Sequence, residues 1–327
     1  MLVAKLQSVV LVAAQALLLC LPLSAMEQPG PPLPAAVPAS PASQPNERWD
    51  DIHLAPEQWP STQVMVGEID KADDLTRELL RVQWRQGDPI DLYIVRPTGV
   101  KRPPVVVFLY SFPAGADRFR DDSFCRAAIR DGFAAVGFAT ALTGQRYHNR
   151  PMKQWFVSEL QESLGKSTHD VQALLNYLAS RGDLDMTRVG IFGQGAGGTI
   201  AILAAAADSR IQAVDALDPW GDWPVWLAKS TVVPGSERDS YTTQSFLEKV
   251  APLDPVKWLP LLKQRSVRLQ LAAFDDSVPE SVREHLRAAL PRGAAFAAYG
   301  TVSEYRERAA DDGKILQWLH HEIVGKK

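Results

Sequence analysis

The chain has 327 residues, of which 46% are hydrophobic and 22% charged, with 35 Lys and Arg against 38 Asp and Glu. This composition is ordinary for a globular protein with a large core, and it excludes the basic surplus that nucleic-acid binding requires. The two cysteines, Cys20 and Cys125, are too few for a disulfide framework, and no Cys or His cluster has the spacing of a metal site.

Residues 1–25 have the pattern of a secretory signal peptide, with cleavage expected after Ala25. Their apolar stretch, over 9–23, is shorter than the ~20 residues of a membrane span. A lipoprotein anchor at Cys20 is disfavoured, because Leu19 stands where a small residue is usual. We therefore expect an exported protein, periplasmic or secreted, with no stable membrane span once the signal is removed.

Residues 26–48 are rich in Pro and Ala and predict a disordered linker, which leaves 49–327 as one domain. The domain opens with runs that alternate between apolar and polar residues and end in turn residues. These runs predict antiparallel strands over 64–69, 79–84 and 90–96. A continuous apolar run over 105–110 then predicts a strand covered on both faces.

From residue 122 onward, helical and strand patterns alternate. Helices are predicted over 122–131, 167–180, 199–207, 281–290 and 311–323. Strands are predicted over 133–140, 188–193, 211–217, 267–274 and 294–299. Between them, 218–260 reads as irregular and resembles a lid-like insertion over about 219–260. The order predicts an α/β fold with a sheet of about eight strands, mostly parallel, and helices on both faces.

The most informative stretch is a glycine-rich turn between a predicted strand and helix, where residues 193–198 read G-Q-G-A-G-G. In α/β-hydrolases a G-x-S-x-G turn carries the serine nucleophile, whereas G-x-G-x-x-G brings backbone N–H groups to a dinucleotide pyrophosphate. The serine position of the first pattern holds Gly195. The second pattern is matched by Gly193, Gly195 and Gly198, and Asp218 follows at the distance of about 20 residues expected for an acidic ribose ligand.

The approach to this turn, DLDMTRVGIFG over 183–193, resembles the segment before the nucleophile elbow in α/β-hydrolases of the dienelactone-hydrolase and prolyl-oligopeptidase kind. Residues 103–112, PPVVVFLYSF, resemble the strand that ends in the oxyanion His-Gly of that family. Residues 275–279, DDSVP, resemble its acid loop. The resemblance runs from Leu79 to the C-terminus and implies the α/β-hydrolase fold.

The catalytic residues that the resemblance implies are not all present. A Ser-His-Asp triad needs a nucleophile, a base and a carboxylate that orients the base. Gly195 stands at the nucleophile position, Ser303 lies where the family places its histidine, and only Asp275 is retained. Loss of both nucleophile and base costs several powers of ten in rate. The sequence therefore indicates a degenerate serine-hydrolase site without a cofactor, in a pseudoenzyme that binds a small molecule.

Two other functions stay open. One is an active esterase or hydrolase with a non-standard nucleophile, for which Ser111 at the mouth of the site is the first candidate. The other is a nucleotide-binding enzyme that uses the three glycines of the G-x-G-x-x-G pattern. We expect a small apolar or sugar-like ligand in the space above the turn. The residues predicted to line this pocket are Tyr110, Ser111, His148, Gln194, Ala196, Trp220 and Trp223.

Overall fold

The computed structural model describes residues 47–54, 63–111, 116–143, 146, 157–310 and 314–325. The predicted signal peptide over 1–25, nearly all of the predicted linker and His148 lie outside these residues. Among the helices of the described residues, none combines the length and the apolar character needed to cross a membrane.

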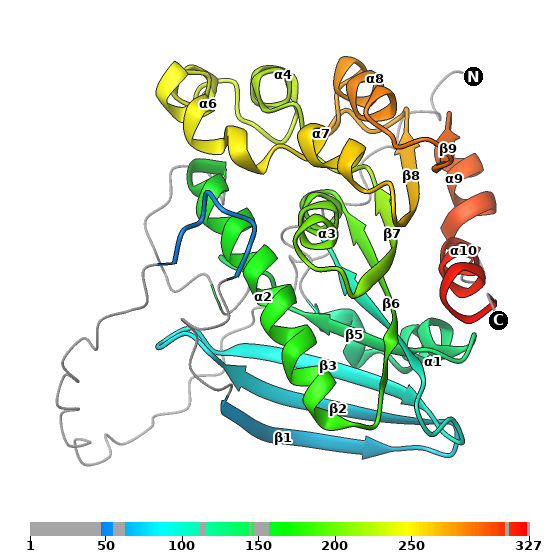
Figure 1. Ribbon diagram of the computed structural model, residues 1–327. Helices are drawn as coiled ribbons and strands as arrows, with labels where there is room; N and C mark the ends of the chain where they lie inside the picture. The colour runs from blue at the N-terminus through cyan, green and yellow to red at the C-terminus, as the bar shows by residue number, and fades with distance from the viewer. Residues whose placement is uncertain are drawn as a thin grey trace, which may run out of the picture. The chain divides into compact units, whose positions relative to one another are not determined.

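A nine-stranded sheet organises the described part of the chain, in the order β1-β2-β3-β5-β4-β6-β7-β8-β9 (Figure 1). The first strands, β1 (Gln63–Lys71), β2 (Leu75–Gln83) and β3 (Ile90–Pro97), pair antiparallel, and β3 also pairs antiparallel with β5. All later pairs are parallel. They join β4 (Pro104–Leu109), β5 (Ala134–Phe138), β6 (Asp185–Gln194), β7 (Ile211–Leu217), β8 (Ser266–Ala272) and β9 (Ala295–Tyr299). The predicted mixed, mostly parallel sheet is confirmed, with nine strands where about eight were predicted.

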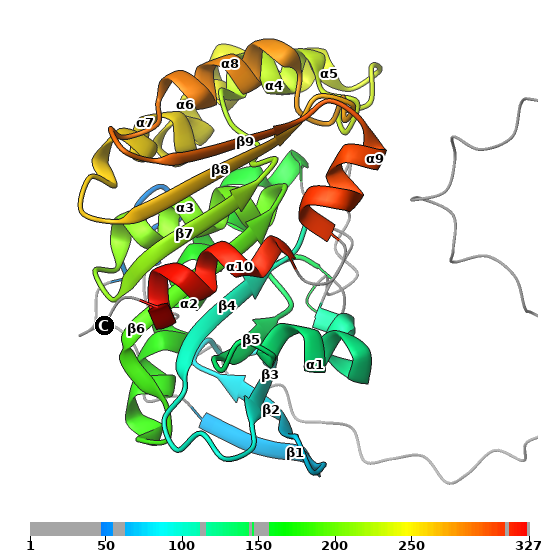
Figure 2. The same cartoon turned by 90° about the vertical axis from the view of Figure 1, so that its right-hand side faces the viewer.

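Helices cover both faces of this sheet, as predicted. On one face, α2 (Leu160–Arg181), α3 (Ala196–Ala207), α4 (Trp223–Lys229) and α8 (Glu280–Ala288) contribute to one apolar core. On the other face, α1 (Asp122–Ile129) and α10 (Lys314–His320) contribute to a second core, and both lie in front of the sheet in Figure 2. Cys125 is fully buried on α1, as a small apolar residue would be.

Three segments differ from the prediction. The segment 218–260, predicted to be irregular, contains short helices in addition to α4, namely α5 (Arg238–Tyr241), α6 (Gln244–Val250) and α7 (Pro255–Trp258). Two of them have side-chain caps, because Thr243 accepts from the Phe246 N–H and Asp254 accepts from the Val256 N–H. The last predicted helix, over 311–323, corresponds to α10 and the start of a π-helical turn over 321–325. It is preceded by α9 (Val302–Tyr305) and a π-helical turn over 306–310, which were not predicted.

The third difference is that α2 begins at Leu160 rather than at 167, and buried charges explain it. Arg85 donates to Glu47 Oε2 at 2.6 Å and also pairs with Asp170 on α2. Arg146 donates to Asp170 Oδ2 at 2.7 Å and to Asp88 Oδ2 at 2.7 Å. The side chain of Asp170 is 0% exposed and that of Arg146 is 2% exposed. Lys166, in the part of α2 that was not predicted, likewise lies 3.3 Å from Asp88 Oδ2. Polar residues that begin this helix thus pair with charges distant in the sequence and lack the apolar periodicity of a typical helix.

The same network anchors the segment 47–54 to α2. His169 forms a hydrogen bond of 2.7 Å with Glu47 Oε1 and one of 2.8 Å with the carbonyl oxygen of Asp51. Burial raises the pKa of Glu47, but hydrogen bonds from His169 and Arg85 outweigh it and lower this pKa to about 2. His169 therefore has a structural role, and Glu47, the first residue that the structure describes, is bonded to the domain.

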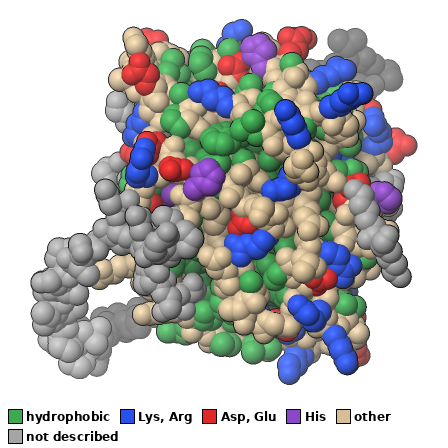
Figure 3. All heavy atoms as spheres, in the orientation of Figure 1, with side chains coloured by type: hydrophobic (Ala, Val, Ile, Leu, Met, Phe, Trp, Pro, Cys, Tyr) green, Lys and Arg blue, Asp and Glu red, His purple; other side chains and the backbone are tan. Residues whose placement is uncertain are grey.

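Basic and acidic side chains are interspersed with apolar and neutral ones on the face shown in Figure 3. A mixed surface of this kind lacks the single-signed stripe that tracks a phosphate backbone. The absence of a nucleic-acid partner stays a prediction from composition.

Candidate functional site

Residues from four parallel strands meet at one edge of the sheet. Tyr110 and Ser111 follow β4, Gly195 follows β6, Asp218 follows β7 and Asp275 comes shortly after β8. Because these strands are parallel, their carboxyl ends lie at the same edge, which is where open α/β sheets bind ligands. The structure therefore brings together most of the site residues predicted from the sequence.

Gly195 forms the sharp turn of a nucleophile elbow. β6 ends at Gln194 and α3 begins at Ala196, and Gly195 between them has φ 57° and ψ −123°. This left-handed conformation is unfavourable for residues with a Cβ and is adopted without strain by glycine. Strand and helix also approach closely, since a Cβ on Gly193 would lie 2.1 Å from the carbonyl oxygen of Gly197. The glycine-rich turn predicted between strand and helix is confirmed.

Ser111 fills the space in which a nucleophile side chain would lie. A Cβ built on Gly195 would lie 2.5 Å from Ser111 Oγ and 2.7 Å from Ser111 Cβ, and 3.4 Å from Trp220 Nε1. The N–H of Ala196 donates to Ser111 Oγ at 3.4 Å. In α/β-hydrolases the N–H of the residue after the nucleophile belongs to the oxyanion hole. Here that donor is directed at a side chain of the protein itself.

Asp275, the residue at the position of the family's acid, orients no histidine of the described residues. Its Oδ1 accepts a hydrogen bond of 2.8 Å from the N–H of Ser277. A carboxylate without a histidine partner is thus stabilised by a backbone N–H. His285, on α8, is bonded instead to Asp222. In the described part of the chain, no histidine forms a hydrogen bond with Asp275 or with Ser111.

The remaining predicted residues of this edge differ in exposure. Tyr110 is 8% exposed, and the guanidinium carbon of Arg118 lies 4.5 Å from the centre of its ring. Burial raises the pKa of Tyr110 to about 12. Gln194 is half-buried at the end of β6, whereas Ser303 is exposed on α9. Ser303 is thus a surface residue and does not take the place of the missing base.

The tryptophans of the lid-like segment belong to the core. Trp220, Trp223 and Trp226 are 4%, 1% and 0% exposed. The rings of Trp220 and Trp226 stack with centroids 4.7 Å apart, and Trp226 Nε1 donates to the carbonyl oxygen of Ser277 at 2.9 Å. These residues pack the segment onto its own domain, so they do not present an open aromatic wall. The predicted apolar or sugar-like ligand stays a prediction.

Asp218 is a functional candidate that the hydrolase pattern alone did not identify. It is 7% exposed, has a left-handed φ of 46° and accepts a hydrogen bond of 2.7 Å from the N–H of Ala272. Burial, assisted by the charge of Asp275, raises its pKa to about 7. Strained backbone and a raised pKa at the ligand-binding edge of a sheet are typical of functional sites.

We expect the raised pKa of Asp218 to make the protein less stable as the pH rises from about 4 to about 7. The unfolded carboxyl loses its proton near pH 4, whereas the folded one keeps it until about pH 7. Between these values the folded state binds more protons, so its stability falls by up to about 1.4 kcal/mol per pH unit. Urea unfolding of the protein and of Asp218→Asn across this range measures the effect. Equal pH slopes for the two proteins would contradict it.

The dinucleotide interpretation is not supported by the fold. A Rossmann domain carries its glycine-rich turn after the first strand, whereas this turn follows β6. Asp218, the candidate ribose ligand, is bonded to the N–H of Ala272.

Among the residues that the structure describes, no group of three or more His, Cys, Asp or Glu could hold a metal ion.

Comparisons with known proteins agree with this geometry. Residues 90–221 match the model of the dienelactone hydrolase family. Acetyl xylan esterase 1 from Thermoanaerobacterium sp. JW/SL YS485 superposes with a TM-score of 0.63 at 15% identity, over 81% of this chain and 88% of that one. Acetyl xylan esterase from Paenibacillus sp. R4 superposes with a TM-score of 0.63 at 16% identity, over 84% of this chain and 93% of that one. A cold-adapted esterase from an Arctic intertidal metagenomic library superposes with a TM-score of 0.53 at 14% identity, over 81% of this chain and 99% of that one. No curated protein matches the chain. At these identities the likeness shows the fold.

Proposed function

The chain is an α/β-hydrolase-fold protein with a dienelactone-hydrolase-like region over 90–221, and from this premise we propose that it is a pseudoenzyme without serine-hydrolase activity at its elbow. One observation carries the proposal: the side chain of Ser111 occupies the space above Gly195 where a nucleophile would stand. Glycine offers no attacking atom, and the donor that would stabilise an oxyanion is directed at Ser111.

Within the part of the chain that the structure describes, Ser111 has no contact that would activate it. A serine hydroxyl becomes a useful nucleophile when a neighbouring base accepts its proton. In the described residues, the hydrogen bond of Ser111 is the one that its Oγ accepts from the N–H of Ala196. No histidine of the described residues therefore holds its proton, and we infer that its reactivity stays that of an ordinary serine.

A second candidate function is an esterase that uses Ser111 itself. The observation that favours it is the position of Ser111 Oγ beside the N–H of Ala196, at the strand ends where Asp218 also lies. A carboxyl with a pKa of about 7 is suited to general base catalysis near neutral pH. This alternative predicts a reactive serine, which the first proposal excludes.

We expect a fluorophosphonate probe to leave the purified protein unlabelled and p-nitrophenyl acetate to be hydrolysed only at the background rate. The reason is the missing base, since these probes react with activated serines. Mass spectrometry after labelling measures the first result, with an active serine esterase as positive control. Labelling or turnover that disappears in Ser111→Ala would establish the second candidate. Labelling that survives in Ser111→Ala would place an activated serine elsewhere and also overturn the proposal.

The variant Gly195→Ser serves as a further control. A serine at this position would place its Cβ 2.5 Å from Ser111 Oγ, so it is expected to remain unlabelled even though it restores the G-x-S-x-G pattern. The double variant Gly195→Ser/Ser111→Gly removes this clash and still lacks the base. Neither variant is therefore expected to be labelled. Labelling of the double variant alone would show that the side chain of Ser111, and not the lack of a base, prevents the reaction.

We also propose that the protein is exported to the periplasm or secreted. The support is the charge, apolar stretch and small residues of 1–25. Intact mass or N-terminal sequencing of the protein expressed with its own N-terminus would test this, and a retained Met1 would contradict it.

A further inference from the structure

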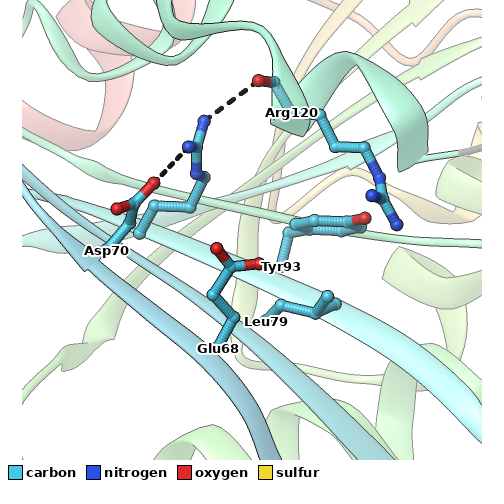
Figure 4. A pocket seen from close by; sticks show the side chains of 6 residues that line it. Glu68, Asp70, Leu79, Tyr93 and Arg120 are labelled. Carbon is cyan, nitrogen blue, oxygen red and sulfur yellow. Dashed lines mark hydrogen bonds and ion pairs between the residues drawn. The ribbon is translucent and has the colours of Figure 1, made fainter.

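A hollow lies away from the elbow, on β1, β2 and β3. It has a volume of about 170 Å³ and is lined by Glu68, Asp70, Arg77, Leu79, Tyr93 and Arg120 (Figure 4). Arg120 belongs to η2 (Ala116–Arg120), and the other five residues belong to the three strands. Four of the six side chains are charged, two of them acidic and two basic, which distinguishes this hollow from a gap in apolar packing.

The strand register accounts for the floor of the hollow. Glu68 of β1 lies opposite Leu79 of β2, and Leu79 lies opposite Tyr93 of β3. Residues directly opposite each other in antiparallel strands point to the same face. The three side chains therefore form one row, with a carboxylate at the outer end, an aliphatic side chain in the middle and an aromatic ring at the inner end.

A glycine on the next strand brings Arg120 to this row. The ring of Tyr93 stacks on Phe119 with centroids 5.7 Å apart. Phe119 reaches the sheet because residue 137 is glycine, since a Cβ there would lie 2.0 Å from the Phe119 ring. This packing fixes η2 against the sheet and places the Arg120 guanidinium 6.0 Å from the centre of the Tyr93 ring.

Arg77 and Asp70 form a fixed wall of the hollow. The Arg77 guanidinium pairs with Asp70, donates to Asp122 Oδ1 at 2.9 Å and donates to the carbonyl oxygen of Arg120 at 3.1 Å. Figure 4 shows two of these contacts as dashed lines. Their charges compensate each other and their hydrogen bonds are used within the protein, so this pair is not the part that would hold a ligand.

Glu68 and Arg120 are the charged residues of the hollow that can contact a ligand. Within the described residues, Glu68 forms no hydrogen bond or ion pair. The Arg120 side chain is 61% exposed and forms a side-chain hydrogen bond with Tyr93. Its ion-pair partner Asp117 is 3.9 Å away and 91% exposed. Such a pair contributes little, because water screens it. The hollow thus offers one carboxylate and one guanidinium, with Leu79 and the Tyr93 ring between them.

We propose that this hollow binds a zwitterionic amino acid with an apolar side chain. Its ammonium group would pair with Glu68, its carboxylate would accept from the Arg120 guanidinium, and its side chain would lie on Leu79 and Tyr93. Arginine suits a carboxylate because its planar fork can donate two parallel hydrogen bonds. The volume of about 170 Å³ is below the ~300–1,000 Å³ of pockets for drug-sized ligands, which favours a molecule of this small size.

Calorimetric or NMR titration of the purified protein with L-leucine and L-phenylalanine tests the proposal. N-acetyl-L-leucine lacks the cation and L-leucinamide lacks the anion, so each is expected to bind about tenfold or more weakly than L-leucine. The variants Glu68→Gln and Arg120→Gln are expected to weaken binding of L-leucine by a similar factor. Both residues are exposed, and circular dichroism checks that the variants are folded.

Glu280→Gln and Arg292→Gln, which change exposed charges elsewhere, are the matched controls and are expected to bind like the unmodified protein. The proposal is overturned if neither amino acid binds saturably at millimolar concentration. It is equally overturned if both blocked derivatives bind as well as L-leucine, or if the hollow and control variants weaken binding alike. None of these results depends on whether the elbow is active.

Discussion

Replacing Asp170 with alanine is expected to lower the free energy of unfolding by about 3–5 kcal/mol. The carboxylate is 0% exposed and lies between the guanidinium groups of Arg85 and Arg146. Its removal leaves two positive charges close together in the interior, and the desolvation of a buried charge without its partner is what makes such changes costly. Urea denaturation followed by circular dichroism measures the midpoint and slope of unfolding.

An exposed ion pair provides the control. Asp50 pairs with Arg48 at 2.8 Å, but the two side chains are 40% and 68% exposed. Asp50→Ala is therefore expected to change stability by less than about 1 kcal/mol. If Asp170→Ala also stays within that range, the network does not anchor α2, and another cause must be found for the early start of this helix.

The second large effect is expected for Gly193→Ala. The new Cβ would lie 2.1 Å from the carbonyl oxygen of Gly197, and this atom belongs to the backbone of α3 and cannot rotate away. Either the strand or the helix must move, and we expect a loss of about 3 kcal/mol, at the upper end of what overpacking usually costs. Thermal or urea unfolding of the soluble variant measures it.

Gly190→Ala on the same strand is the matched control. There the Cβ would lie 3.1 Å from Leu319 Cδ2, a methyl group at the end of a side chain that can shift slightly. We expect a change of about 1 kcal/mol or less. Equal losses for the two variants would show that loss of glycine on β6, and not the approach of α3, determines the cost.

The sequence predicted the central strands well because their apolar runs are long and local. Val105 to Leu109 are fully or almost fully buried, as a strand covered on both faces must be. The beginning of α2 was missed because its stabilising partners, Arg85 and Asp88, are far away in the sequence. A pattern of neighbouring residues carries no signal for such contacts.

For the candidate site, the sequence predicted where the residues lie in the fold better than it predicted which side chains contact each other. Gly195, Asp275 and Ser111 lie where the hydrolase resemblance implies, at the strand ends. That Ser111 would occupy the space above Gly195 could not be read from the sequence, since the two residues come from different strands. The hollow beside Glu68 and Arg120 was missed for the same reason, because it depends on the register of β1, β2 and β3.

The backbone conformation of residue 195 makes an exchange of serine for glycine more favourable than the reverse exchange. A serine held at φ 57° and ψ −123° stores strain of about 1–3 kcal/mol, which glycine relieves while costing about 0.5–1 kcal/mol through its freer unfolded chain. Exchange of serine for glycine is thus tolerated by the fold without a second change. The reverse exchange meets both the strain and the side chain of Ser111. The geometry of this turn therefore favours glycine over serine, and a serine at residue 195 also requires a change at residue 111.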